Sequence, residues 1–112
     1  MPDTTSSNLV RGTVDLLVLK ALEREATHGF AIARWIRDGS DEAVHFEDAA
    51  LYQSLHRLER QGLVESSWGR SETNRRARFY CLTTRGRRRL ASRARAFRSY
   101  ADAVTRLLEA ER

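Results

Sequence analysis

One stretch, EDAALYQSLHRLERQGLVESSW, restricts the fold of this chain more than any other. Leu51, Leu55 and Leu58 recur at spacings of four and three residues, which predicts a helix with one buried face. Gly62 fits the position just past the helix end, where a left-handed residue brings Leu58 and Leu63 together. The residues after Gly62 alternate between two faces, as they do in a strand. The sequence therefore predicts a helix that passes directly into a strand.

A second strand-like run, ARFYCL, follows the first, and the segment GRSETNRR separates the two. Gly69 and Asn74 are residue types that turns favour, so the segment is predicted to be the tip of a β-hairpin. Arg70, Arg75 and Arg76 give this tip a strong positive charge. An isolated basic tip is often only a solvated turn. Directly after an amphipathic helix, however, it predicts the wing of a winged helix.

Helices are also predicted before and after this unit. Residues 12–22 carry apolar side chains on two faces, so this helix should be buried on both sides. Thr27 is a suitable N-cap for a helix over residues 28–38, and Thr83 or Thr84 for one that continues almost to the C-terminus. The pair of helices before the hairpin matches a helix-turn-helix, in which the second helix presents its polar face to DNA.

The last helix carries apolar residues at alternating spacings of four and three, a seam that is typical of helices that pair with each other. A small domain has no free face left to cover this seam, so the sequence predicts a homodimer. The residues expected at the dimer interface come from the first and last helices: Leu16, Leu19, Leu90, Ala94, Phe97, Ala101, Val104 and Leu108.

The predicted fold is mainly α with a small β-hairpin: a winged helix-turn-helix plus a long C-terminal dimerisation helix. With 112 residues, the chain has the length of one domain. Residues 1–8 are predicted to be a disordered N-terminal arm, residues 9–83 the winged-helix DNA-binding domain, and residues 84–112 the C-terminal dimerisation helix.

The distribution of charge indicates an anionic partner. Residues 70–98 contain eleven arginines and a single acid, Glu72, whereas residues 1–69 contain seven basic and eleven acidic side chains. The whole positive excess of a chain with net charge +5 therefore lies in one segment. Clustered positive charge of this kind is the electrostatic signature of nucleic-acid binding, so duplex DNA is the expected partner.

The predicted DNA contacts place the third helix in the major groove and the hairpin on the flanking backbone or minor groove. The contacting residues are Tyr52, Gln53, His56, Arg57, Arg60, Arg70, Arg75 and Arg76. Simpler interpretations stay open, because Tyr52 could pack beneath the wing and the other side chains could form a solvated face. Four more arginines could extend the DNA surface or pair with the acidic first half of the chain; they are Arg85, Arg87, Arg88 and Arg89.

The sequence argues against several other classes of protein. His28 and His45 have no partner at metal-ligand spacing, so neither a metal nor another cofactor is expected. The single cysteine, Cys81, cannot form an intramolecular disulfide. No nucleophile–base pair, paired carboxylates or phosphate loop is visible, so an enzyme is not expected. Neither a signal peptide nor a membrane-spanning segment is predicted, and a reducing cytoplasm fits best.

Four motifs stand in an order that resembles one known family. RGTVDLLVL, HGF, LYQSLHRLE and RRARFYCLTTRG occur in the order found in PadR-type transcriptional regulators, within residues 9–108. The resemblance implies a dimeric, cytoplasmic winged-helix regulator of the small subgroup that has a single C-terminal dimerisation helix. It also implies a repressor that small aromatic or amphiphilic compounds release from DNA. Gln53 stands where relatives often have proline, which adds a hydrogen-bonding group to the reading face.

Three further expectations follow. The two-fold symmetry of a dimer implies an inverted-repeat operator. Trp35 and Trp68 are the candidates for stacking on a flat effector, although tryptophans more often belong to a core. The alternative function is a winged-helix module that binds protein without binding DNA, and the concentration of arginine in residues 70–98 argues against it.

Overall fold

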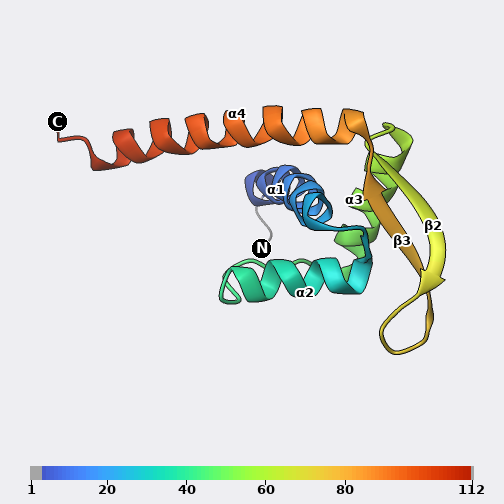
Figure 1. Cartoon of the computed structure of the whole chain (residues 1–112). Coiled ribbons are helices and arrows are strands. Elements are labelled where there is room, and N and C mark those ends of the chain that lie inside the picture. Colours follow the sequence, from blue (N-terminus) through green and yellow to red (C-terminus); the bar gives the residue numbers. More distant parts are fainter. Residues whose placement is uncertain (1–3, 112) are drawn as a thin grey trace.

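The computed structural model describes residues 4–111 of the chain, and the side chains of residues 12–111. The elements follow in the order α1 (Thr4–Arg24), β1 (Thr27–His28), α2 (Gly29–Gly39), α3 (Asp48–Arg60), β2 (Val64–Arg70), β3 (Arg76–Leu82) and α4 (Thr84–Glu109). Figure 1 shows α1 between α4 and α2, with the β2–β3 hairpin at one side of the helices. The prediction of a mainly helical winged-helix fold with a long C-terminal helix is confirmed.

α1 is the central helix of the core. Val14, Val18 and Leu22 are buried on it, and the helix packs against α2, α3, α4 and β3. The apolar side chains on both of its faces are therefore covered by other elements of the same chain, as the sequence predicts.

α1 begins earlier than predicted. Its first residue is Thr4 rather than residue 12, so residues 4–8 of the expected disordered arm are helical, and residues 1–3 lie outside the described residues. Starting a helix is costly, but each residue added to an existing helix gains a backbone hydrogen bond. The apolar part of α1 starts the helix in the core, so its extension through the polar segment TTSSN adds backbone hydrogen bonds without a new helix start.

α2 begins one residue later than predicted. Thr27 and His28 pair antiparallel with β3 and are therefore extended, which moves the start of the helix to Gly29. The N-cap is His28 rather than Thr27: the Nδ1 atom of His28 accepts a hydrogen bond from the Ala31 N–H at 3.3 Å. A strand of two residues is too short to leave an alternation in the sequence.

α3 ends as predicted. Gly62 has a left-handed φ of 75°, and its N–H donates to the Glu59 carbonyl at 3.0 Å. The Leu63 N–H donates to the Leu58 carbonyl at 2.9 Å. These two bonds are the Schellman motif, and they place Leu63 in the core at the point where β2 begins.

β2 and β3 form a hairpin whose strands are longer than predicted. The register pairs Arg70 with Arg76, so these two arginines end the strands and the tip is reduced to residues 71–75. Asn74 adopts a left-handed φ of 60°, which asparagine tolerates better than most residues. β1 pairs with the other edge of β3, so the sheet has the order β1-β3-β2.

The start of α4 is fixed tightly to the domain. The Thr83 hydroxyl accepts a hydrogen bond from the Gly86 N–H at 3.0 Å, which confirms Thr83 as the N-cap. A Cβ atom at Gly86 would collide with the backbone carbonyl of Leu63, so only glycine allows this close approach. Leu90 is buried in the core. Beyond that point α4 extends past α1 and α2, as Figure 1 shows.

Membrane-spanning helices and metal sites were both sought among the described residues. Among residues 4–111, no helix is both long and apolar enough to cross a membrane. The same residues contain no group of three His, Cys, Asp or Glu side chains placed to hold a metal ion.

Candidate nucleic-acid interface

The two faces of α3 differ sharply in polarity. The three leucines of the predicted stripe are buried. The opposite face presents four of the predicted DNA contacts to solvent, namely Tyr52, Gln53, His56 and Arg60. Because Tyr52 is 59% exposed, it does not pack beneath the wing. α3 therefore has the form of a recognition helix, with its apolar side in the core and its hydrogen-bonding side free.

Arg57 does not belong to this exposed face. Its Nη2 donates to Oδ1 of Asp15 at 2.7 Å, and its Nε donates to Oδ2 of the same residue at 3.4 Å. The buried Ser54 hydroxyl donates to the same carboxylate at 2.6 Å. These bonds engage two of the five guanidinium N–H groups, so Arg57 is at least partly committed to the packing of α3 on α1, and its contact with DNA stays a prediction. The long side chain reaches back from the edge of the face and holds α3 to α1.

The three predicted wing arginines are exposed. Arg70 donates from Nη1 to the Asn74 carbonyl at 3.2 Å and so supports the tip. The guanidinium of Arg76 lies 4.3 Å from the centre of the Trp68 ring. Among the described side chains, no carboxylate pairs with Arg70, Arg75 or Arg76. Their positive charge is therefore available to an external anion.

A polar network joins the base of the wing to α3. The Ser66 hydroxyl donates to Glu59 Oε2 at 2.6 Å, and the Nε of Arg78 donates to the Ser66 hydroxyl at 3.0 Å. Nη2 of Arg78 also lies 3.8 Å from Glu59 Oε2. The recognition helix and the wing are thus held together by side chains as well as by the chain itself.

A groove of about 760 Å³ runs between α3 and the wing. Tyr52 and His56 of α3 line one side, and Trp68, Arg76 and Arg78 line the other. Side chains that were predicted from two separate parts of the sequence therefore border one surface. Its aromatic and cationic lining suits a sugar–phosphate chain, which offers apolar sugars and negative oxygens.

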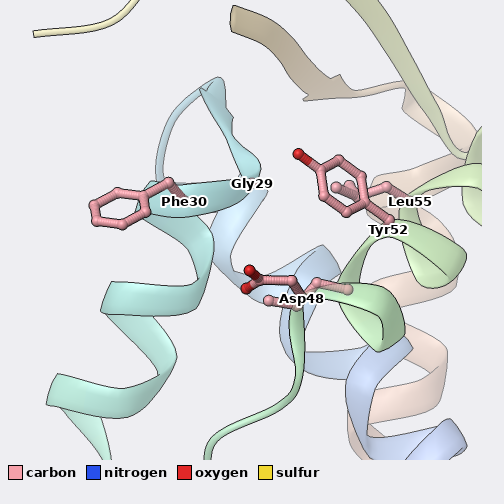
Figure 2. Close-up of a pocket in the computed structure, with 6 residues that line it drawn as sticks. Gly29, Phe30, Asp48, Tyr52 and Leu55 are labelled. Atoms are coloured by element: carbon pink, nitrogen blue, oxygen red, sulfur yellow. The ribbon is translucent and has the colours of Figure 1, made fainter. Parts of the chain in front are cut away.

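A second, smaller hollow of about 400 Å³ lies where α2 and α3 begin. Figure 2 shows Phe30 of α2 on one side of it, and Asp48 and Tyr52 of α3 on the other. Phe30 is 69% exposed and also lines the groove beside the wing. Sequence reasoning missed Phe30 because it lies off the buried stripe of α2. The position of Phe30 in the sequence could have identified it, since a large apolar residue outside a buried stripe must face solvent or a partner.

The two tryptophans proposed as effector contacts lie in different places. Trp35 is partly buried against the core, and the guanidinium of Arg24 lies 5.2 Å from the centre of its ring. Trp68 is 56% exposed on the wing. They line different hollows, that of Trp35 on α2 and that of Trp68 between α3 and the wing. The structure therefore does not bring them together on one ligand.

Two of the predicted dimer-interface residues belong to the core of the chain itself. Leu19 is 0% and Leu90 4% exposed, so neither can contact a second molecule and their prediction as interface residues is wrong. Leu16 is partly buried against the same core. The apolar spacing is the same for a residue that packs on its own domain and for one that packs on a partner, so periodicity could not separate them.

The rest of the seam on α4 is accessible. Phe97 is 50% and Leu108 80% exposed. The members of the seam that are partly exposed are Ala94, Ala101 and Val104. Two exposed apolar residues next to the seam, Tyr100 and Leu107, were missed by the strict four–three spacing. Together these side chains form an apolar stripe on the part of the helix that extends beyond the domain.

The arginines at the start of α4 lie without a described acidic partner. Arg85, Arg87, Arg88 and Arg89 form no ion pair with any side chain of residues 12–111. Pairing with the acidic first half of the chain is therefore not observed within that range. Figure 1 places the start of α4 at the base of the wing, at the end opposite its tip.

Comparison with known proteins gives consistent matches. The model of the transcriptional regulator PadR-like family matches residues 18–92. The structure of a PadR family transcriptional regulator from Eggerthella lenta is 31% identical with a TM-score of 0.76, over 96% of this chain and 92% of that one. A transcriptional regulator from Clostridium thermocellum is 25% identical with a TM-score of 0.82, over 91% and 99%. An uncharacterised protein from Lysinibacillus sphaericus is 20% identical, over 92% and 94%.

The exposed recognition helix and the basic wing beside it define a winged-helix, DNA-binding transcription regulator. Because the family model spans residues 18–92 and the fold agrees over nearly the whole chain, the chain belongs to the transcriptional regulator PadR-like family. The resemblance found in the sequence motifs is confirmed.

Proposed function

We propose that this protein is a homodimeric repressor that binds an inverted-repeat operator in duplex DNA. The observation that carries the proposal is the groove between α3 and the wing, where exposed hydrogen-bonding and cationic side chains from both elements meet. The polar network of Glu59, Ser66 and Arg78 keeps this surface in shape without DNA. A preformed surface spends less binding free energy on ordering side chains.

α3 reads the operator from the major groove. The amide of Gln53 can accept from and donate to an adenine edge at the same time, which is a base-specific contact. Tyr52, His56 and Arg60 lie along the same exposed face and reach base edges or phosphates. Phe30 and the apolar floor of the neighbouring hollow lie beside them and offer contact to a sugar or a thymine methyl group.

The wing contributes affinity rather than sequence reading. Arg75 is exposed at the tip, and its charge has no carboxylate partner among the described residues. Arg70 and Arg76 flank it at the ends of the two strands. Arginines placed in this way neutralise phosphates or enter the narrow minor groove next to the helix.

Dimerisation sets the form of the operator. A stripe that exposes Phe97 and Leu108 on a helix projecting from the domain is costly in water and is covered when two copies pair. A two-fold dimer presents two recognition helices to half-sites about one helical turn apart, roughly 10 base pairs, or a multiple of that.

Regulation by a small molecule completes the proposal. An exposed Trp68 with the guanidinium groups of Arg76 and Arg78 at 4.3 and 5.3 Å from its ring centre offers a stacking surface to a flat aromatic effector. Trp35 offers less, because it is partly buried against the core. An effector bound at Trp68 would occupy the groove that DNA needs, and so would release the repressor.

The test is selection of bound duplexes from a random library, followed by footprinting on the selected sequence. The proposal predicts an inverted repeat protected on both half-sites, with binding that weakens steeply as salt rises. A protein that selects no sequence and is not retained by random duplex or heparin at low salt would instead be the protein-binding module of the alternative function.

A further inference from the structure

The wing tip contains one acidic side chain among its arginines. Glu72 is the only acid between Glu65 and Asp102, and it lies in the five-residue tip beside Arg75. A carboxylate next to DNA phosphates weakens binding by repulsion. The charge therefore works against the affinity that the surrounding arginines provide. An acid at this position is better explained if its side chain has a second, structural role.

Glu72 has a long-range partner in the body of the domain. Its Oε1 lies 3.2 Å from Nε2 of His28, which is 44 residues away in the chain. The side chain of His28 is 9% exposed, whereas that of Glu72 is 75% exposed. One end of this contact is thus fixed in the domain, and the other belongs to a solvated hairpin tip.

His28 is held firmly on three sides. Nδ1 accepts the hydrogen bond from Ala31 that caps α2, which makes Nε2 the ring nitrogen that carries the proton and donates to Glu72. The backbone of His28 pairs with Phe79 in the sheet, and the two rings meet edge to face at 5.2 Å. The position of the Nε2–H is therefore set by α2 and by the sheet together.

The contact bridges a hollow between α2 and the wing. This hollow, of about 900 Å³, is lined by Phe30 and Arg34 of α2 and by Glu72 and Arg75 of the wing, with His28 between them. Hydrogen bonds from its own backbone N–H and then from His28 lower the pKa of the Glu72 carboxyl. The carboxylate is therefore ionised at neutral pH and is a strong acceptor.

We propose that Glu72 and His28 form a wing latch, a positioning pair that holds the tip of the wing against the start of α2. The latch sets where Arg75 stands relative to the reading face of α3, and it rests on the proposed function for its effect on DNA. The base of the wing is fixed by Glu59, Ser66 and Arg78, so the wing latch supplies the second fixed point, near the tip.

Two substitutions of Glu72 separate this role from simple charge repulsion. Glu72→Gln removes the charge but keeps an oxygen that accepts from Nε2–H. Glu72→Ala removes both. If the carboxylate only repels phosphates, both variants bind operator more tightly and to the same extent. The wing latch predicts opposite results: Glu72→Gln binds at least as tightly as the wild type, and Glu72→Ala binds about 3- to 10-fold more weakly, as expected for one lost hydrogen bond.

Glu65 provides the matched control. It is an exposed acid on β2 of the same hairpin, and its carboxylate has no hydrogen bond or ion pair among the described side chains. Glu65→Gln and Glu65→Ala remove the same charge, so the two should change operator affinity equally. A difference between the Gln and Ala forms that is present at residue 72 and absent at residue 65 identifies the hydrogen bond.

Amide hydrogen exchange tests the wing latch without DNA. The wing latch predicts faster exchange of the Ala31 and Asn74 N–H groups in Glu72→Ala than in the wild type, and wild-type rates in Glu72→Gln. Equal exchange rates in the two Glu72 variants, together with equal operator affinities, would overturn the wing latch. If the wild type bound no duplex at all, the proposed function would fail, whereas the exchange experiment would still decide the wing latch.

Discussion

The carboxylate of Asp15 in α1 accepts a hydrogen bond from the Nη2 of Arg57 in α3 at 2.7 Å. Oδ2 of the same carboxylate lies 3.9 Å from Nη1 of Arg93 in α4. One side chain of the central helix, itself nearly buried, therefore links α1 to the recognition helix and to the helix proposed to dimerise. The placement of α3 and α4 on α1 therefore shares one carboxylate.

Replacing Asp15 with alanine should lower the free energy of unfolding by about 3–5 kcal/mol, because Arg57 loses its partner in a partly buried site. Urea denaturation measures the change. Glu23→Ala is the control: it breaks the exposed pair with Lys20, also at 2.7 Å, and should cost less than about 1 kcal/mol. Similar losses of unfolding free energy in the two variants would show that burial does not strengthen the pairing of Asp15 with Arg57.

Two glycines in helices should respond oppositely to alanine. Gly86→Ala should destabilise the fold by about 1–3 kcal/mol or more, because the new methyl group meets the Leu63 carbonyl. Gly12→Ala should stabilise it by about 0.5–1 kcal/mol, because a Cβ there meets nothing within 4 Å and alanine favours the helix. Thermal denaturation of both variants is the measurement, and a stable Gly86→Ala protein would contradict the close approach of α4.

The exposed stripe on α4 predicts that Phe97→Asp separates the dimer. Sedimentation at micromolar concentration should show a folded dimer for the wild type and a folded monomer for the variant. The variant should also lose operator affinity, because each half-site alone binds weakly. Ser99→Asp adds the same charge at an exposed position on the face of α4 opposite the stripe and should remain dimeric. A wild-type protein that is monomeric and folded at this concentration would refute the prediction.

The spacing of the operator should follow the helical repeat of DNA. Inserting about 5 base pairs between the half-sites turns them to opposite faces of the duplex and should weaken binding to the level of one half-site. Inserting about 10 base pairs returns both half-sites to the same face of the duplex. This longer insertion should therefore weaken binding less than the shorter one. Anisotropy titrations on the three duplexes provide the comparison. Full affinity for a single, non-palindromic half-site would exclude the symmetric arrangement.

Local signals in the sequence predicted local structure correctly. The helix stop at Gly62 and the cap at Thr83 depend on the preferences of residues within one turn, and both are confirmed. The exposed face of α3 followed from the spacing of its leucines alone. The wing followed from the order of elements, since a hairpin after an amphipathic helix has few other arrangements.

Tertiary contacts explain what the sequence could not predict. Leu90 fits the spacing of the dimer seam, but the close approach allowed by Gly86 brings it into the core of its own chain. Arg57 fits the polar face of α3, but its partner Asp15 is 42 residues away. The pairing of His28 with Phe79 depends on a strand of two residues. None of these contacts leaves a periodic pattern.

The central claim is that the recognition helix supplies sequence specificity while the wing supplies charge. Arg75→Ala tests the wing, because its charge has no carboxylate partner in the described part of the chain. Gln53→Ala tests the helix, because an amide that reads a base edge carries no charge to a phosphate. Arg106→Ala, at the end of α4 remote from the wing (Figure 1), is the control for loss of one arginine.

The most direct measurement is a salt titration of fluorescence anisotropy on operator and on random duplex for these three variants. Arg75→Ala should weaken binding to both DNAs about equally and lower the slope of log affinity against log salt by roughly 2, which is about 0.9 for each site of the dimer. Gln53→Ala should leave random-DNA binding and the slope unchanged and cost about 1–3 kcal/mol per half-site on operator. Arg106→Ala should match the wild type. A loss of operator preference in Arg75→Ala with an unchanged salt slope would contradict the account and make the wing the reader of sequence.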